Sequence, residues 1–493
     1  MKAYGVTVVL VLCTTQISLA IPRPDFGVNA PVYGGADVAS TAQESGTLIN
    51  EVNDNLDITL DSGYTLLTTI KNHLVGIADD FTAKGLAVSD AIDALAASNG
   101  PLDDAFTDFE TASDDLIDLI ENGLTTYFTE LDTNLDDSIT TMLTDAFDDV
   151  IADLNTLDGL LDSLKTQLQN ALTAAGSNPP SKAILRKFVS TSLTSTIAKT
   201  VISLKANIPL VTYIIANSIE NLKVADDYIF ESGTVATDAM ENVNVGLEAL
   251  EAEVQLYSDD TSQITDIIDP VYQENFDFSG LDLSGISLIE SEINEYRETY
   301  TTDLGATIDD IKDIYDSYKQ DILLVSDGLG AFYSDYACDH LHELVLVLIS
   351  NGKYADYCFN KYAPRTFALF DKQAREANRC VDREITRLLK LQEILLAMAK
   401  MLVFNIEDIL AEVTICVQAP ELCNTDDIEA AFHGVHLAAR EHQNSMKNLV
   451  TYETLAGLNR LSACFSSSKS LLVLESANMV TEINTCETDG PTA

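Results

Sequence analysis

The sequence predicts an all-α protein: extended amphipathic helical arms or a helical bundle, followed by a disulfide-stapled helical C-terminal domain. Apolar residues recur at every third or fourth position over long stretches, which is the period of one helix face. Pro and Gly mark only a few breaks between these stretches. All cysteines except Cys13 lie after residue 337, so a disulfide framework would serve the C-terminal part alone.

Residues 1–20 (MKAYGVTVVLVLCTTQISLA) are expected to be a removed secretory signal. A Lys and an apolar run precede Ser18 and Ala20, which are small residues that suit a signal peptidase. The alternative is a membrane anchor, but the apolar run from Val6 to Cys13 is too short to span a bilayer. We expect no transmembrane segment after signal removal, so the mature protein should be soluble, secreted and extracellular.

The charge of the chain is strongly acidic and uneven. Residues 1–335 carry 14 Lys and Arg against 57 Asp and Glu, whereas residues 336–493 carry 14 against 21. Such a field repels phosphates, so nucleic acid is not expected as a partner. The apolar share of 46 % is too high for simple disorder.

The region before the cysteines is expected to be helical. Residues 21–58, which contain Pro and Gly, predict a flexible N-terminal extension, and residues 59–330 an acidic helical region. Its clearest apolar stripe crosses 117–168 in fourteen steps over 51 residues, about 3.6 residues per step, so one nearly straight helix could carry it. Two interpretations remain open: a helical hairpin or coiled-coil arm, or shorter bundle helices broken near Gly123 and Gly159.

An acidic stretch inside this stripe resembles part of a calcium loop but is incomplete. Asp132, Asn134 and Asp136 have the first three spacings, whereas Asp137 and Leu143 stand where Gly and Glu are needed. Diffuse screening by cations is therefore expected, and no dedicated calcium site.

Two further breaks divide the acidic helical region. The first is 176–181 (GSNPPS), and the second is a linker near 259–285. Residues 176–223 hold six Lys and Arg against one acid, Glu220. This cationic apolar stretch could lie on a membrane surface, but we favour packing against the acidic helices. An amphipathic run follows at 289–322, and its tyrosines are expected to be core or groove residues.

A cysteine-containing helical domain is expected at 335–487, followed by a tail at 488–493. Its cysteines are odd in number, so one thiol stays free or pairs between chains. Cys416 and Cys423 flank a turn and are the expected local pair, while the other pairings stay open. The seven cysteines are Cys338, Cys358, Cys380, Cys416, Cys423, Cys464 and Cys486.

The longest helix of this domain is expected over 364–413, beginning at Pro364, a favoured first-turn residue. A basic stripe recurs on it every fourth residue, and part of it has acids at ion-pair spacing. The stripe is either an ordinary solvated face or a surface that docks the acidic N-terminal helices, within one chain or between two. Docking would need several ion pairs plus apolar contact, because one surface pair contributes only about 0–1 kcal/mol. The stripe consists of Arg375, Arg379, Arg383 and Arg387, with Asp371 and Glu384 as expected partners of the first and last.

The cysteine framing has a known counterpart. The segment CFNKYAPRTFALFDKQAREANRC, residues 358–380, with the later Cys416, Cys423, Cys464 and Cys486, resembles the TsetseEP domain, a family of secreted proteins of flies and mosquitoes named after a tsetse midgut protein. The resemblance covers roughly residues 335–487 and rests on cysteine framing and helix pattern. It implies an insect origin, export and a gut setting, and it brings no agreed enzymatic activity. This chain lacks the Glu-Pro repeats of the protein that gave the family its name.

No catalytic residue or cofactor is expected. His433 and His436 lie three apart with His442 nearby, and His340 and His342 lie in the first helix of the domain. Zinc needs three or four convergent ligands, so a lone His-x-x-His does not predict a metal site. The sequence has no His-Glu-x-x-His, no Gly-x-Ser-x-Gly, no phosphate loop and no dinucleotide fingerprint.

The expected function is therefore that of a secreted structural or interaction protein, not an enzyme, with a protein partner or self-association. The alternative is an extracellular carrier of a lipid or another apolar ligand, although few Lys and no Trp are present for such an interface. A metal-dependent enzyme is the second alternative.

Overall fold

The computed structural model describes residues 25–275 and 287–492. Within these ranges it is helical apart from turns and one isolated bridge between Asp25 and Val28, which confirms the predicted all-α fold. The expected signal at 1–20 lies outside the described residues, as do 276–286 of the expected linker. The rest of that linker is mostly helix α9 (Ser262–Asn275).

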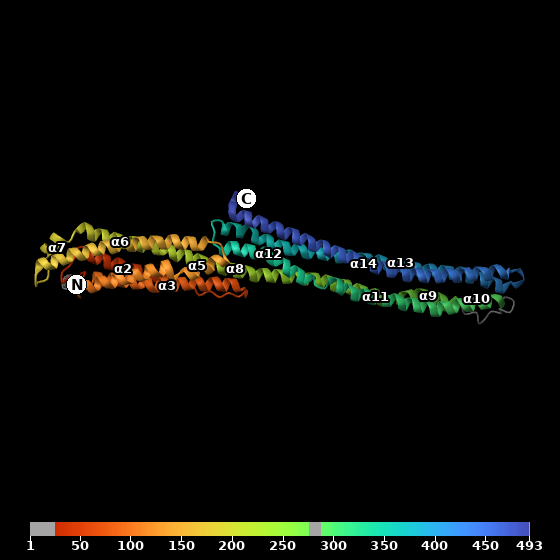
Figure 1. Cartoon of the computed structure of the whole chain (residues 1–493). Helices are drawn as coiled ribbons and strands as arrows, with labels where there is room; N and C mark the ends of the chain where they lie inside the picture. The colour runs from red at the N-terminus through yellow and green to blue at the C-terminus, as the bar shows by residue number, and fades with distance from the viewer. Residues whose placement is uncertain (1–24, 276–286, 493) are drawn as a thin grey trace, which may run out of the picture. The chain divides into compact units, whose positions relative to one another are not determined.

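The chain divides into two compact units, which we describe separately. Of the described residues, the first unit contains 25–231, 342–363 and 482–492, and the second contains 232–341 and 364–481. This division cuts across the domain expected at 335–487, because the long C-terminal helices contribute residues to both units. The helices are labelled in Figure 1.

The first unit is a bundle of packed helices. Helix α3 packs against α2, α4 and α5, and α6 packs against α4, α5 and α7. Phe81 of α3 and Phe147 of α6 meet in the core with ring centroids 5.2 Å apart. Burial of each such side chain stabilises the fold by about 1.5–3 kcal/mol. The helices are α2 (Gly35–Glu51), α3 (Thr65–Ala96), α4 (Leu102–Asp118), a π-turn (Leu119–Gly123), α5 (Thr125–Asn134), α6 (Ser138–Ala175), α7 (Lys182–Phe188) and the start of α8 (Thr191–Asp259).

Helix α2 is a correction to the expected flexible extension at 21–58. Its Val38, Ala42 and Ile49 are buried, and the Ser89 hydroxyl of α3 donates a hydrogen bond to the Ala42 carbonyl at 2.6 Å. The periodic apolar residues between the glycines give α2 a face to bury against α3. The Pro and Gly content therefore marks only the turn that precedes this helix.

The apolar stripe over 117–168 is shared by several helices. The helical run α4 to α5 passes Gly123 through the π-turn and ends before Leu135, which is extended (φ −128°, ψ −173°). The Asp136 carboxylate accepts hydrogen bonds from the Ser138 amide and hydroxyl at the start of α6. Helix α6 then continues through Gly159 without a break. The interpretation as shorter helices is therefore the closer one, but the main break is at 135–137, because Asp136 competes for the backbone there. The break expected at 176–181 is confirmed, since α6 ends at Ala175 and α7 begins at Lys182.

The second unit is built around a long helical hairpin. Helices α13 (Ala355–Gln418) and α14 (Thr425–Asp489) are joined by a short 3-10 turn (Pro420–Leu422), and they lie side by side in Figure 1. The end of α8 and helix α11 pack beside them: Asn378 of α13 donates to the Asn242 carbonyl of α8, and Lys447 of α14 contacts Asp310 of α11. The remaining helices are α9, α10 (Ser287–Glu298), a second π-turn (Thr299–Asp303), α11 (Leu304–Ser326) and the first part of α12 (Leu329–Ile349), whose residues from His342 on belong to the first unit.

Helix α13 corrects the expected start at Pro364. The helix begins nine residues earlier, at Ala355, and Pro364 lies inside it. Pro cannot donate the backbone hydrogen bond of that turn, but Cys358 pins the preceding segment to α14 through its disulfide with Cys486. A constraint that is distant in sequence therefore supports a helix start that local preference does not favour.

One helical run, Thr191–Pro270, is long and apolar enough to cross a membrane by length and composition, although the sequence analysis expects no such segment. Buried helices of soluble bundles pass the same test. Part of this run packs inside the first unit, where Lys205 pairs with Glu44 of α2 and Asn207 donates to Asp153 of α6. These contacts agree with the favoured interpretation that the cationic apolar stretch packs against acidic helices.

Candidate functional site

Disulfides join α13 and α14 at both ends and at an intermediate position. Cys416 pairs with Cys423 across the turn, as expected from their spacing. Cys380 pairs with Cys464 in the second unit, and Cys358 with Cys486 in the first. The last two have Cα atoms 5.9 and 5.8 Å apart, within the range for disulfides. Six of the seven expected cysteines are thus paired, and the side chain of the seventh, Cys338, lies outside the described residues.

The four arginines of the expected stripe share one exposed face of α13. Arg375 pairs with Asp371 and Arg387 with Glu384, as predicted, and Arg379 pairs with Glu376. Arg383 has no ion pair within 4 Å among the described residues. The stripe is therefore largely neutralised on its own helix, and the positive charge that is free to meet a partner is concentrated near Arg383.

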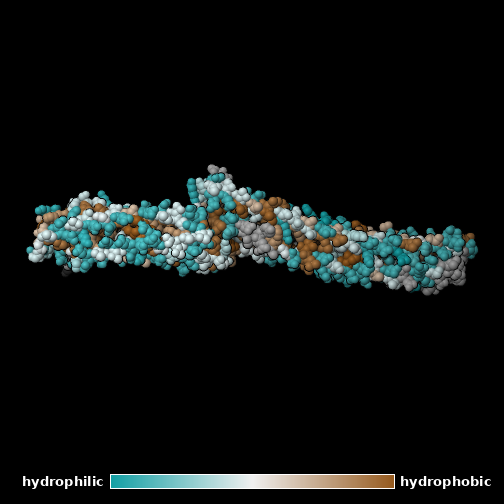
Figure 2. Space-filling model, viewed as in Figure 1, coloured by the Kyte–Doolittle hydropathy of each residue, from teal (hydrophilic) through white to brown (hydrophobic). Residues whose placement is uncertain are grey.

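An apolar segment continues the same face of α13. Ile394, Met401, Phe404 and Ile415 follow Arg383 at intervals of 11, 7, 3 and 11 residues, which keep one side of a helix in line. All four side chains are about half exposed or more, with Phe404 at 62 %. Figure 2 shows hydrophobic side chains reaching the surface of the second unit among hydrophilic ones. We call Arg375, Arg379, Arg383, Arg387, Ile394, Met401, Phe404 and Ile415 the α13 face.

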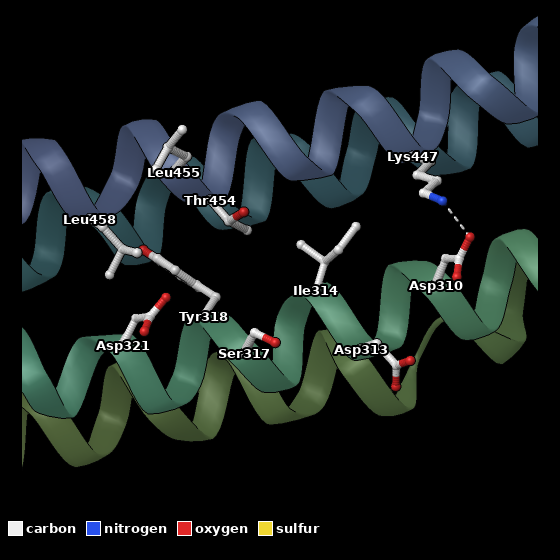
Figure 3. Close-up of a pocket in the computed structure, with 10 residues that line it drawn as sticks. All are labelled: Asp310, Asp313, Ile314, Ser317, Tyr318, Asp321, Lys447, Thr454, Leu455 and Leu458. Atoms are coloured by element: carbon white, nitrogen blue, oxygen red, sulfur yellow. Dashed lines mark hydrogen bonds and ion pairs between the residues drawn. The ribbon is translucent and has the colours of Figure 1, made fainter.

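A groove of about 320 Å³ lies between α11 and α14 in the second unit. Its acidic rim comes from α11 and includes Asp310, whose carboxylate lies 2.5 Å from the Lys447 ammonium (Figure 3). Apolar atoms of Leu455 and Leu458 line the α14 side. This lining suits a cationic group on an apolar stem. The lining residues are Asp310, Asp313, Ile314, Ser317, Tyr318, Asp321, Lys447, Thr454, Leu455 and Leu458.

A buried ion cluster borders this groove and joins α13 to α14. The Glu384 side chain is only 3 % exposed, and its carboxylate accepts two hydrogen bonds of 3.1 Å from the Arg460 guanidinium. Arg387 contacts the same carboxylate. Burial and the charge of Glu384 raise the pKa of the nearby Tyr318 hydroxyl, while the two arginines oppose that shift. The phenol therefore stays protonated and cannot act as a base at neutral pH.

A glycine makes this close arrangement possible. A Cβ atom on Gly457 would lie 2.7 Å from the Tyr318 hydroxyl oxygen and 3.3 Å from the Glu384 carboxylate. Sequence reasoning assigned Tyr318 to a core or groove, which the structure confirms, because the ring is buried and it lines the groove. The role of Arg460 could not be found from the sequence, because an isolated arginine 76 residues from Glu384 forms no local pattern with it.

The histidines fall into separate environments. His340 is fully buried and its Nδ1 lies 2.9 Å from the Ser476 hydroxyl, a core contact between α12 and α14. His342 belongs to the first unit, where its Nδ1 lies 2.8 Å from the Tyr64 hydroxyl. His436 is buried beside two glutamates of α10, and His433 is exposed on the adjacent turn of α14. Sequence reasoning missed this grouping because the glutamates lie some 140 residues upstream.

Comparisons with known proteins add no relatives. No family model matches the chain, and neither the curated proteins nor the solved structures contain a match. The resemblance of residues 335–487 to the TsetseEP domain therefore stays a prediction.

Proposed function

We propose that this chain is an exported, acidic, helical protein whose function is to bind another protein. We further propose that this partner is a second copy of the same chain. The observation that carries the proposal is the α13 face, on which a cationic segment and an exposed apolar segment are aligned. Docking requires several ion pairs together with apolar contact. The exposed apolar residues of the α13 face supply the contact, and Arg383 supplies a cation that has no ion pair among the described residues. Arg375, Arg379 and Arg387 would add ion pairs by exchanging their acidic neighbours on α13 for acids of the partner.

The charge distribution of the chain favours acidic helices of another copy as the occupant of this face. Residues 25–231 carry 9 Lys and Arg against 33 Asp and Glu. Opposite charges on two surfaces of the same chain steer copies together and fix their register. In the second unit, residues 364–481, which carry the α13 face, are nearly balanced, with 12 Lys and Arg against 15 Asp and Glu, whereas residues 232–341 carry 3 against 25. Positive charge in this unit is therefore concentrated on the hairpin.

Export belongs to the same proposal. Disulfides persist in oxidising compartments, so the three pairs are compatible with an extracellular protein. The N-terminal sequence and the resemblance to the TsetseEP domain support secretion from an insect tissue such as the gut.

The carrier alternative has less support from the described cavities. The apolar cavity inside the first unit, lined by Ile49, Phe81 and Ile208 among others, measures about 20 Å³. Pockets for ligands of drug size are typically about 300–1,000 Å³. Two described cavities have such a volume. The groove between α11 and α14 has an acidic rim, and a pocket of about 400 Å³ in the first unit has Lys182 and Arg186 beside Leu185 and Val189, so neither lining suits a wholly apolar ligand.

The test is the molar mass of the purified mature protein, measured by light scattering at low and high salt. We expect an assembly at low salt that dissociates as salt screens the charges. Arg383→Glu and Phe404→Ser should each weaken it. Matched controls on α14, Arg440→Glu and Leu474→Ser, make the same changes at exposed positions outside the α13 face and should leave the mass unchanged.

Two outcomes would overturn the proposal. A monomer at every salt and protein concentration would exclude self-association, and extractable lipid in that monomer would favour the carrier. An assembly that the controls weaken as much as the α13 variants would show that another surface holds the copies together.

A further inference from the structure

Helices α10 and α14 bring acids and histidines together in the second unit. Glu292 and Glu295 lie three residues apart on α10, and His433 and His436 lie three apart on α14. Residues at this spacing project from the same side of a helix. Ligand atoms of Glu292, Glu295 and His436 all lie within 4.8 Å of one another, and the His433 Nδ1 lies 3.7 Å from a Glu292 carboxylate oxygen.

His436 and Glu292 form the sheltered half of the group, while Glu295 and His433 lie at its exposed edge. His436 is 4 % exposed, and the Tyr296 ring stands edge-on to its imidazole with centroids 6.1 Å apart. The Glu292 side chain is 18 % exposed, and its Oε2 atom is buried without a hydrogen bond from any described residue. The 3.7 Å contact with His433 is too long for a hydrogen bond. A buried carboxylate oxygen without a donor costs stability, and a bound cation would remove that cost.

The ligand types indicate which cation. Calcium and magnesium prefer oxygen ligands alone, whereas imidazole nitrogen combined with carboxylate oxygen suits zinc. Zinc binds nitrogen and oxygen ligands at about 2.0–2.2 Å, usually four in a tetrahedron. Side-chain rotations that draw the Glu292, Glu295 and His436 ligand atoms together from within 4.8 Å, and turn the exposed His433 ring toward them, would close the group around one ion.

We propose that Glu292, Glu295, His433 and His436 bind one Zn²⁺ ion between α10 and α14. This site does not depend on self-association. The three disulfides all join α13 to α14 or close the turn between them. The zinc ion would fasten α10 to the same scaffold. Because α10 (Ser287–Glu298) continues through the π-turn Thr299–Asp303 into α11, zinc would hold the first part of this helical run against α14.

The test is calorimetric titration of the metal-stripped mature protein with Zn²⁺ at physiological salt. We expect one site per chain. Glu295→Gln and His433→Gln change exposed residues, so they should leave the fold intact, as circular dichroism would check. Each should weaken binding by about tenfold or more. Asp309→Asn on α11 and His442→Gln on α14 are the matched controls, and they should bind zinc as the wild type does.

Two further measurements separate a built site from adventitious binding. Co²⁺ in the same site should give the visible absorption of a tetrahedral complex, and Glu295→Gln should abolish it. Zinc should slow hydrogen exchange at the α10 amides of the wild type but not of Glu295→Gln. Binding without fixed stoichiometry, or binding that these variants leave unchanged, would mean that zinc only screens the acidic surface and would overturn the proposal.

Discussion

Residues 25–231 of the first unit and the α13–α14 hairpin of the second unit keep helices together by different means. The first region has 33 acids against 9 bases and no cysteine, and it depends on apolar burial among many helices. The hairpin, over 364–481, has 15 acids against 12 bases, two disulfides and a buried ion cluster. A region with high net charge repels itself, so the stability of the first region should depend on salt and pH. The stability of the hairpin should depend on individual disulfides and on the buried ion cluster.

Within the hairpin over 364–481, the largest effect is expected from the disulfide between Cys380 and Cys464. It closes a long loop, with a sequence separation of 84, and in the chain-entropy model such a link contributes about 4–5 kcal/mol. The double variant Cys380→Ser/Cys464→Ser should lower the free energy of unfolding by about that amount in denaturant titrations without reductant. Cys416→Ser/Cys423→Ser, which opens a separation of only 7, should cost about 2–3 kcal/mol. Equal losses would show that loop closure does not explain the stability of the hairpin.

Glu384→Ala should be next in size. It leaves Arg460 and Arg387 without their shared buried carboxylate, and breaking one partner of a buried ion pair costs about 3–5 kcal/mol. Arg387 is half-exposed, so water screens its part of the interaction. We therefore expect the free energy of unfolding to fall by about 3 kcal/mol, as measured by urea unfolding. Glu384→Met combined with Arg460→Leu should recover much of it, because an apolar pair can replace a buried ion pair. A double variant no better than the single one would contradict this account.

These contacts also show what the sequence could predict. Apolar periodicity identified the helices, and the interval of seven residues identified Cys416 with Cys423, because both are local patterns. Arg387 was predicted as a partner of Glu384 because it lies three residues away. Arg460 as the second partner of Glu384, and Cys464 as the partner of Cys380, could not be predicted, since they lie 76 and 84 residues away and depend on how α13 and α14 align. Helix α2 was missed for another reason: burial against α3 outweighs the local influence of Pro and Gly.

Within the first unit, Asp226 should make the stability fall in acid. Burial alone would raise the pKa of its carboxyl, but hydrogen bonds from Ser62 and Asp61 and the charge of Lys223 outweigh burial and lower the pKa. The amides of Asp61 and Ser62 donate to the carboxylate at 2.7 and 3.0 Å. Because the folded pKa is the lower one, this stabilisation is present above the unfolded value of about 3.9 and is lost as the pH falls through the folded value.

The variant Asp226→Asn should therefore be less stable than the wild type at pH 7, by about 1.5–3 kcal/mol for bonds to a charged acceptor. Urea unfolding at a series of pH values should show the difference shrinking as the solution becomes acidic. Asp227→Asn, which changes the exposed neighbour that also contacts Lys223, is the control and should have little effect. A difference that stays constant down to acid pH would mean that the charge of Asp226 is not what stabilises this contact.

The smallest expected effect is an increase in stability, opposite in sign to the others. It tests directly whether charge repulsion destabilises the first region. Burial and the neighbouring charges of Asp162, Glu110 and Asp114 raise the pKa of Asp158 on α6. A raised folded pKa means that the charged carboxyl destabilises the fold, so stability falls as the pH rises from the unfolded value through the folded one.

Asp158→Asn should accordingly stabilise the first unit at neutral pH by a few tenths of a kcal/mol, the size of like-charge pairs on helices. The gain should be largest at low salt and should shrink toward the part due to burial at about 1 M salt, where charges more than a few ångströms apart are screened. Thermal unfolding of the wild type, of Asp158→Asn and of the exposed control Asp90→Asn at several salt concentrations measures this. If both variants gain the same stability, general repulsion destabilises the region. If only Asp158→Asn gains stability, the repulsion comes from the neighbouring acids of α4 and α6.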